Sequence, residues 1–227
     1  MLAAILFDLD GTLANTDPLH FQTWQEVLRA YDMDIDRTFY DANISGRLNP
    51  VIVRDLLPQL SEVEGEQLAY RKEAQFREIA LGLTPLAGLL DVLQWICDRK
   101  LKTAVVTNAP RENVNFVLEV LELVNTFDTV VLSEEVTAGK PDPAPYQFAL
   151  KQLGIYAQEA IAFEDSPSGI KSAVAAGIYT IGIASTHNPN HLADAGAAMV
   201  IPDFTAKELW QLLDSWMGVD LTVFSEQ

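Results

Sequence analysis

The sequence ILFDLDGTL, residues 5–13, joins an apolar run directly to two aspartates that are one residue apart. Residues 3–7 have the composition of a buried strand, and Asp8 and Asp10 follow at its carboxyl end. In an open parallel sheet, ligands bind beyond the carboxyl ends of the strands. Two carboxylates held together there repel each other unless a cation joins them, and Mg²⁺ prefers such oxygen ligands. The stretch therefore predicts a metal site near a phosphate, or more simply a strand that ends in a solvated acidic turn.

The composition argues against several classes of protein. The chain has 227 residues and a formal net charge of −17. Nucleic acid binding needs a basic surface, so this charge argues against nucleic acid as a partner. An anionic substrate would also be repelled unless a metal ion and a few basic side chains reverse the field locally. No apolar stretch is long enough to span a membrane, so we expect no membrane partner.

The sequence also gives expectations about the location of the protein in the cell, its cysteine and its oligomeric state. The N-terminal segment carries neither a basic stretch nor a cleavage site, so we expect a cytoplasmic protein. Cys97 is the one cysteine of the sequence, which excludes an intrachain disulfide and a thiolate metal cluster. It falls in an apparent amphipathic helix at 86–100, where we expect it in or near the core. A monomer is the simplest expectation for the oligomeric state.

The order of apolar patterns predicts the fold class. After the first strand, residues of about 15–82 show only helical spacing of apolar side chains. From 85 onward helices and strands alternate, with strands expected at 103–107, 129–132, 160–163, 178–183 and 199–201. Such alternation is typical of an α/β protein with a doubly wound, Rossmann-like parallel sheet. We therefore predict a catalytic core of 1–14 and 83–227 with an inserted all-α cap of 15–82.

Three further strand ends carry polar side chains. Thr107 and Asn108 follow the second expected strand, just before a helix that Pro110 can start. Lys140 precedes a proline, which holds its backbone extended. Glu164 and Asp165 follow another apolar strand. Taken singly, these features are typical of a helix cap, a surface lysine and acids near a helix N-terminus. Together with the first acidic pair, they place two acid pairs, a hydroxyl and a lysine at one edge of one sheet.

In this order the four segments resemble the motifs of the haloacid dehalogenase superfamily. The likeness is to its Mg²⁺-dependent phosphotransferases that carry a helical cap after the first motif, and it covers nearly the whole chain. The resemblance implies that Asp8 is a nucleophile that forms an aspartyl-phosphate and that Asp10 is the general acid/base. It also implies that Thr107, with nearby amides such as that of Asn108, binds the phosphoryl oxygens. Lys140 would hold the charges of the nucleophile and the phosphate together.

The same resemblance implies a Mg²⁺ site. Its ligands would be Asp8, the backbone carbonyl of Asp10, and Asp165. Glu164 would contribute either directly or through a water molecule. Because both acid pairs are present, a metal-free dehalogenase acting on carbon is disfavoured.

The cap segment resembles that of β-phosphoglucomutase and related sugar-phosphate phosphatases in three places. His20 is predicted at the substrate site, where it either assists Asp10 or forms a hydrogen bond across the closed cleft. It could instead be a helix-surface or hinge histidine, and the sequence leaves both alternatives open. Arg47 in a short polar turn and Lys72 in the third cap helix are predicted to bind substrate. The arginine stands a little earlier than the mutase pattern expects.

We therefore expect a Mg²⁺-dependent phosphatase that acts on a small phosphorylated metabolite, a sugar phosphate in the first place. The alternative within the family is a phosphomutase of the β-phosphoglucomutase type. A catalytically inactive module that binds phosphometabolites is a third hypothesis, although a pure binder would not need both a nucleophile and an acid/base.

Overall fold

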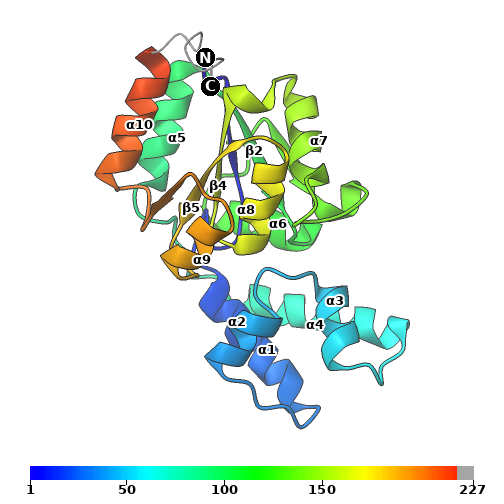
Figure 1. Cartoon of the computed structure of the whole chain (residues 1–227). Helices are drawn as coiled ribbons and strands as arrows, with labels where there is room; N and C mark the ends of the chain where they lie inside the picture. The colour runs from blue at the N-terminus through cyan, green and yellow to red at the C-terminus, as the bar shows by residue number, and fades with distance from the viewer. Residues whose placement is uncertain (219–227) are drawn as a thin grey trace.

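The core of the protein is a six-stranded parallel sheet, described by a computed structural model that covers residues 1–218 (Figure 1). The strand order is β3-β2-β1-β4-β5-β6. The strands are β1 (Ala4–Phe7), β2 (Lys102–Thr107), β3 (Thr129–Leu132), β4 (Ala160–Glu164), β5 (Tyr179–Ile183) and β6 (Met199–Ile201). The chain order reverses at β1, so the crevice beyond the carboxyl ends of β1 and its neighbours is the expected binding place.

Two layers of helices cover the sheet because side chains of each strand alternate between its faces. Ile5 and Phe7 of β1 belong to one hydrophobic cluster, and Ala4 and Leu6 belong to another. The first cluster includes residues of α5 (Leu89–Arg99), α6 (Arg111–Val120) and α10 (Lys207–Gly218). The second includes residues of α7 (Ala144–Leu153) and α8 (Pro167–Ala175). A short helix, α9 (Pro189–Asp194), and two 3₁₀ turns, η1 (Ser133–Glu135) and η2 (Ala157–Glu159), complete the core.

Four helices between β1 and α5, called the cap helices below, gather beyond one end of the sheet (Figure 1). They are α1 (Asp17–Arg29), α2 (Arg37–Asn43), α3 (Asn49–Leu56) and α4 (Glu62–Ile79). They bury a hydrophobic cluster of their own that includes Trp24, Tyr40 and Leu68. Ser61 begins the long helix α4 with a capping box, in which its side chain and that of Glu64 satisfy each other's backbone N–H groups.

The predicted fold class is confirmed, and every expected strand is present within a residue or two of its predicted ends. The separate cluster of the cap helices supports the division into core and cap, which stays a prediction. Residues 219–227 of the predicted core range lie outside the described residues. Among the described residues, no helix is both long enough and apolar enough to cross a membrane.

The expectation for Cys97 was wrong, because its side chain is exposed. The buried face of α5 is made by Leu89, Val92, Leu93, Trp95 and Ile96. Cys97 is the next residue after this face, and a turn of about 100° per residue directs it away from the core.

Candidate active site

Asp8 and Lys140 form the centre of the site at the carboxyl edge of the sheet. Asp8 follows β1, and its backbone N–H donates to the carbonyl of Phe163 on β4, 3.0 Å away. Lys140 Nζ donates to Asp8 Oδ1 at 2.6 Å, to Glu164 Oε1 at 2.5 Å and to the Val106 carbonyl at 2.7 Å. All three donor positions of the ammonium group are therefore used. The lysine joins segments that follow β1, β2 and β4.

Three buried carboxylates face this single ammonium group. Oxygen atoms of Asp8, Glu164 and Asp165 all lie within 4.8 Å of one another. Burial, and then the charge of Glu164, raise the pKa of Asp8 to about 8, although Lys140 opposes the shift. Burial and the neighbouring carboxylates Asp8 and Glu164 also raise the pKa of Asp165 well above its usual range. Because three carboxyl groups face one ammonium group, the cluster is suited to a divalent cation with oxygen ligands, which would favour their ionised forms.

The loop after β1 leaves room for the Asp165 carboxylate. Gly11 has a φ of +76°, and a Cβ placed on it would lie 2.1 Å from Asp165 Oδ2. Any other residue would therefore be strained there and would displace the carboxylate. Thr186, in the loop after β5, donates a hydrogen bond from its hydroxyl to the same Oδ2 atom. The glycine and the threonine together fix where this acid points.

Glu164 is held differently from the other two acids. Its Oε1 atom accepts from Lys140 and, at 2.7 Å, from the hydroxyl of Tyr146 on α7. Its Oε2 atom is buried without a hydrogen-bond partner among the described residues. A Cβ on Gly169 would lie 1.9 Å from that oxygen, so the glycine in α8 permits this close approach. Glu164 thus positions Lys140 with one oxygen, while its other oxygen lies against Gly169.

Thr107 and Asn108, the second predicted motif, make different kinds of contact. Thr107 Oγ1 accepts from the backbone N–H of Ala109 at 3.0 Å, so its hydroxyl lies within the turn that precedes α6. The Asn108 side chain accepts from the Lys140 N–H at 3.0 Å and donates to the Lys140 carbonyl at 3.3 Å. The Asn108 side chain therefore holds the lysine loop in place. Its predicted role in substrate binding stays a prediction.

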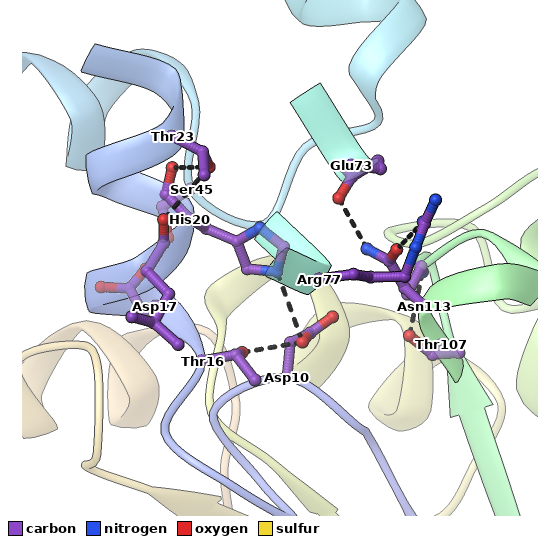
Figure 2. Close-up of polar contacts among 12 residues, drawn as sticks. Asp10, Thr16, Asp17, His20, Thr23, Ser45, Glu73, Arg77, Thr107 and Asn113 are labelled. Carbon is purple, nitrogen blue, oxygen red and sulfur yellow. Dashed lines mark hydrogen bonds and ion pairs between the residues drawn. The ribbon is translucent and has the colours of Figure 1, made fainter. Parts of the chain in front are cut away.

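Asp10 belongs to a polar network with the first cap helix (Figure 2). Its Oδ1 atom accepts from the hydroxyl of Thr16 at 2.7 Å and lies 3.5 Å from His20 Nε2. Burial by itself would raise the pKa of Asp10, but the contacts with His20 and Thr16 outweigh it and lower the pKa. The ring of His20 stacks on Phe76 of α4 at a centroid distance of 3.9 Å. His20 therefore contacts Asp10 in the structure, whereas its predicted role at the substrate site stays a prediction.

Lys72 approaches His20 from the other side of the imidazole ring. Its Nζ atom lies 2.7 Å from His20 Nδ1 and 2.9 Å from Glu73 Oε1. Burial, opposed by the charge of Glu73, lowers the pKa of Lys72. Because an ammonium group can only donate, Nδ1 accepts and the ring proton is assigned to Nε2, which faces Asp10. Lys72 therefore contacts Asp10 through the histidine, and it also lines the cleft, so its predicted role in substrate binding stays a prediction.

Three residues that the sequence did not reveal, Glu73, Asn113 and Arg77, extend this network to the core (Figure 2). Glu73 Oε2 accepts from Asn113 Nδ2 at 2.6 Å, and Asn113 Oδ1 accepts from Arg77 at 2.6 Å. Burial would raise the pKa of Glu73, but Lys72 and His20 lower it to about 2. No local motif marks these residues, since each looks like an ordinary polar position of a helix.

Arg47 lies in the turn between α2 and α3. Its guanidinium donates to the Asn43 carbonyl at 2.6 Å and pairs with the carboxylate of Asp55. The side chain is about one third exposed, at 33%. It lines the same cleft as the acidic cluster, so its predicted role in substrate binding stays a prediction.

A cleft of about 500 Å³ separates the core from the cap helices. Residues of the core line one side, including Asp8, Asp10, Thr107, Lys140 and Asp165. The cap side is more apolar and includes Trp24, Tyr40, Ile44 and Ile52. The volume suits one small organic molecule.

A Rossmann-like sheet whose carboxyl edge carries a lysine-bridged acidic cluster under a helical cap defines the class of capped α/β hydrolases. Residues 5–183 match the sequence model of the haloacid dehalogenase-like hydrolases. Since the match spans most of the chain, the protein belongs to this family. The resemblance predicted from the four motifs is thereby confirmed.

Individual relatives agree with the family. The chain is 30% identical over 221 residues to a phosphorylated carbohydrates phosphatase of Thermotoga maritima, covering 93% of this chain and 100% of that one. It is 24% identical over 195 residues to a β-phosphoglucomutase of Bacillus subtilis, covering 80% and 83%. A crystal structure of a family IA, variant 3 hydrolase from Entamoeba histolytica superposes with a TM-score of 0.84 at 27% identity, covering 95% and 100%. The chain is a phosphoric monoester hydrolase of this family.

Proposed function

We propose that the protein is a Mg²⁺-dependent phosphatase that hydrolyses a phosphorylated sugar or a similar small metabolite through an aspartyl-phosphate on Asp8. The contact between Lys140 and Asp8 at 2.6 Å, at the floor of a cleft of about 500 Å³, carries this proposal. A lysine there neutralises a nucleophile and an incoming phosphate together, which phosphoryl transfer requires. The relative from Thermotoga maritima, named for phosphorylated carbohydrates, supports the class of substrate.

The first half of the reaction transfers the phosphoryl group to the protein. A carboxylate oxygen of Asp8 forms a bond to phosphorus while the bond from phosphorus to the leaving alcohol oxygen breaks. Asp10 gives its proton to that oxygen. His20 and Thr16 lower the pKa of Asp10 in the free protein. The negative charge of a bound phosphate acts in the opposite direction and raises this pKa, because it disfavours the ionised carboxylate. Asp10 can then carry the proton that it donates.

The second half releases phosphate. A water oxygen attacks the phosphorus of the aspartyl-phosphate, Asp10 takes the proton from the water, and the bond from phosphorus to Asp8 breaks. Thr107 and the amides of its turn hold the transferring oxygens, as the N-terminus of a helix does for other anions. The cap helices exclude other water from the cleft during transfer.

A bound Mg²⁺ would supply the positive charge that Lys140 alone does not provide. Asp8 and Asp165 would hold it, together with the Asp10 carbonyl, and Glu164 would contribute directly or through a water molecule. The observation that fits this ion is that three carboxyl groups, those of Asp8, Glu164 and Asp165, lie close together and face the single ammonium group of Lys140.

The charges on the cap side favour a phosphatase over a phosphomutase. A mutase holds a bisphosphate intermediate and needs a second phosphate site opposite the first. Lys72 contacts Glu73, Arg47 contacts Asp55, and Arg77 donates to Asn113, so each of these three cations already has a partner in the protein. A single phosphate at the core with a neutral polyol toward the cap fits this arrangement.

A panel of sugar monophosphates incubated with Mg²⁺ or with EDTA tests the proposal, with both free phosphate and isomerised sugar phosphate measured. We expect magnesium-dependent release of phosphate from at least one sugar phosphate. Isomerisation of β-glucose 1-phosphate without net release of phosphate would establish the mutase instead. Absence of turnover on the whole panel would favour a binding module.

A further inference from the structure

Asn113 makes a two-point contact between the core and the cap. It lies in the first turn of α6, six residues after Thr107, and its side chain is 1% exposed. Its amide nitrogen donates to Glu73 and its amide oxygen accepts from Arg77, both at 2.6 Å (Figure 2). Glu73 and Arg77 are four residues apart on α4, so they lie on one face of that helix. One core side chain thus fixes one turn of a cap helix.

Glu73 connects Asn113 to Asp10 through Lys72 and His20. Its other oxygen, Oε1, accepts from Lys72 at 2.9 Å and from Asn49 of α3 at 2.6 Å. Two donors on one oxygen and one on the other leave the carboxylate a single orientation. Lys72 is then directed at His20 Nδ1, 2.7 Å away. The position of the imidazole proton next to Asp10 therefore depends on how Glu73 is held.

We propose that Asn113 is a positioning residue, which fixes Glu73 when the cap lies against the core and thereby directs the Nε2–H of His20 at Asp10. The hydrogen bonds of Asn49 and Lys72 to Glu73 lie within the cap and survive its opening, whereas that of Asn113 crosses from the core. Asn113 is therefore the link that exists only in the closed arrangement. The catalytic part of this inference rests on the proposed phosphatase function.

The polarity of this contact offers a sharp test. Asn113→Asp keeps the shape and the acceptor for Arg77 but sets a carboxylate against Glu73. Glu73→Gln keeps the shape but removes the negative charge. In the double variant, the new glutamine donates to the new aspartate, and its oxygen still accepts from Lys72 and Asn49. Donor and acceptor are exchanged, and the summed charge of the pair is unchanged.

We expect each single variant to lower kcat about tenfold or more with little change in KM, because the displaced group acts on the transition state and does not touch the substrate. The double variant should recover kcat to within about threefold of the unmodified protein. Asn115→Asp, an exposed position two residues further on α6, is the matched control and should leave kcat unchanged. Thermal unfolding of each variant checks that it is folded at the assay temperature.

Nitrogen-15 NMR of the imidazole groups gives a readout that does not depend on activity. The unmodified protein should show the His20 tautomer with its proton on Nε2, and Asn113→Asp should give a mixture of tautomers. The inference is overturned if His20 carries its proton on Nδ1, if Asn113→Asp retains the kcat and the tautomer, or if the folded double variant is no better than the singles. A protein that shows the expected tautomer change but hydrolyses no sugar phosphate would refute the proposed function alone.

Discussion

Lys140 Nζ lies 2.6 Å from Asp8 Oδ1, although the two residues are 132 positions apart in the sequence. Asp8 is placed by β1, and the backbone of Lys140 is held on both sides by the side chain of Asn108, which follows β2. The same ammonium group reaches Glu164 at the end of β4. Three neighbouring strands therefore converge on one charge pair, and the chemistry of the site depends on how rigidly they hold it.

Tyr146→Phe should separate the role of Glu164 from simple packing. The tyrosine hydroxyl donates to Glu164 Oε1 at 2.7 Å in a fully buried setting. Its removal leaves a buried carboxylate oxygen with Lys140 as its remaining donor, which should cost about 1–3 kcal/mol of unfolding free energy. Tyr156→Phe, which is 78% exposed, is the control and should change the stability little. Urea unfolding measures both, and equal stability of the two variants would contradict the role assigned to this hydrogen bond.

Magnesium should stabilise the protein more at alkaline than at acidic pH. The pKa of Asp8 is raised from 3.8 to about 8 by burial and by Glu164, so between these values the folded protein keeps a proton that the unfolded chain has lost. This contribution to stability is full below the unfolded pKa and is lost as the pH rises through the folded pKa. A bound cation must displace that proton at low pH and meets a free carboxylate at high pH.

The pH dependence of stabilisation by Mg²⁺ is measured by thermal unfolding with Mg²⁺ or with EDTA at about pH 5 and about pH 8. We expect a larger upward shift of Tm by Mg²⁺ at the higher pH. Asp8→Asn should make the shifts at the two pH values more alike, and the raised pKa of Asp165 accounts for any difference that is left. Equal shifts at both pH values in the unmodified protein would show that the cation does not compete with this proton.

Arg47→Ala tests whether the cap turn reaches the substrate. Arg47 and Arg54 both contact Asp55, but only Arg47 lines the cleft. If Arg47 donates to a substrate hydroxyl, its removal should raise KM roughly tenfold and leave kcat almost unchanged. Arg54→Ala, which removes a 71% exposed side chain from the same aspartate, should affect neither constant. Similar kinetics of the two variants would assign Arg47 to the structure of the turn alone.

The residues that the sequence predicted best are those that follow strands. Asp8, Thr107, Lys140 and Asp165 were found because a parallel sheet brings its carboxyl ends together, whatever the length of chain between them. The order of apolar patterns predicted the sheet for the same reason. Each of these inferences needs only local pattern and a general rule of topology.

The residues that the sequence did not reveal act across the boundary between core and cap. Asn113 and Glu73 are 40 positions apart and sit on helices whose relative placement no local pattern encodes. Tyr146 resembles an ordinary core aromatic until its hydroxyl is seen against Glu164. The substrate-binding role predicted for Lys72 stays a prediction, but the sequence did not reveal Glu73 and His20 as the partners that its buried ammonium group needs.

The most direct test of the central claim is phosphate release by Asp8→Asn in the presence of Mg²⁺. Asparagine keeps the shape of the side chain but has no carboxylate oxygen to attack phosphorus, so we expect kcat to fall by at least about a thousandfold on any sugar phosphate that the unmodified protein hydrolyses. A folded Asp8→Asn variant that releases phosphate within about tenfold of the normal rate would contradict an aspartyl-phosphate on Asp8.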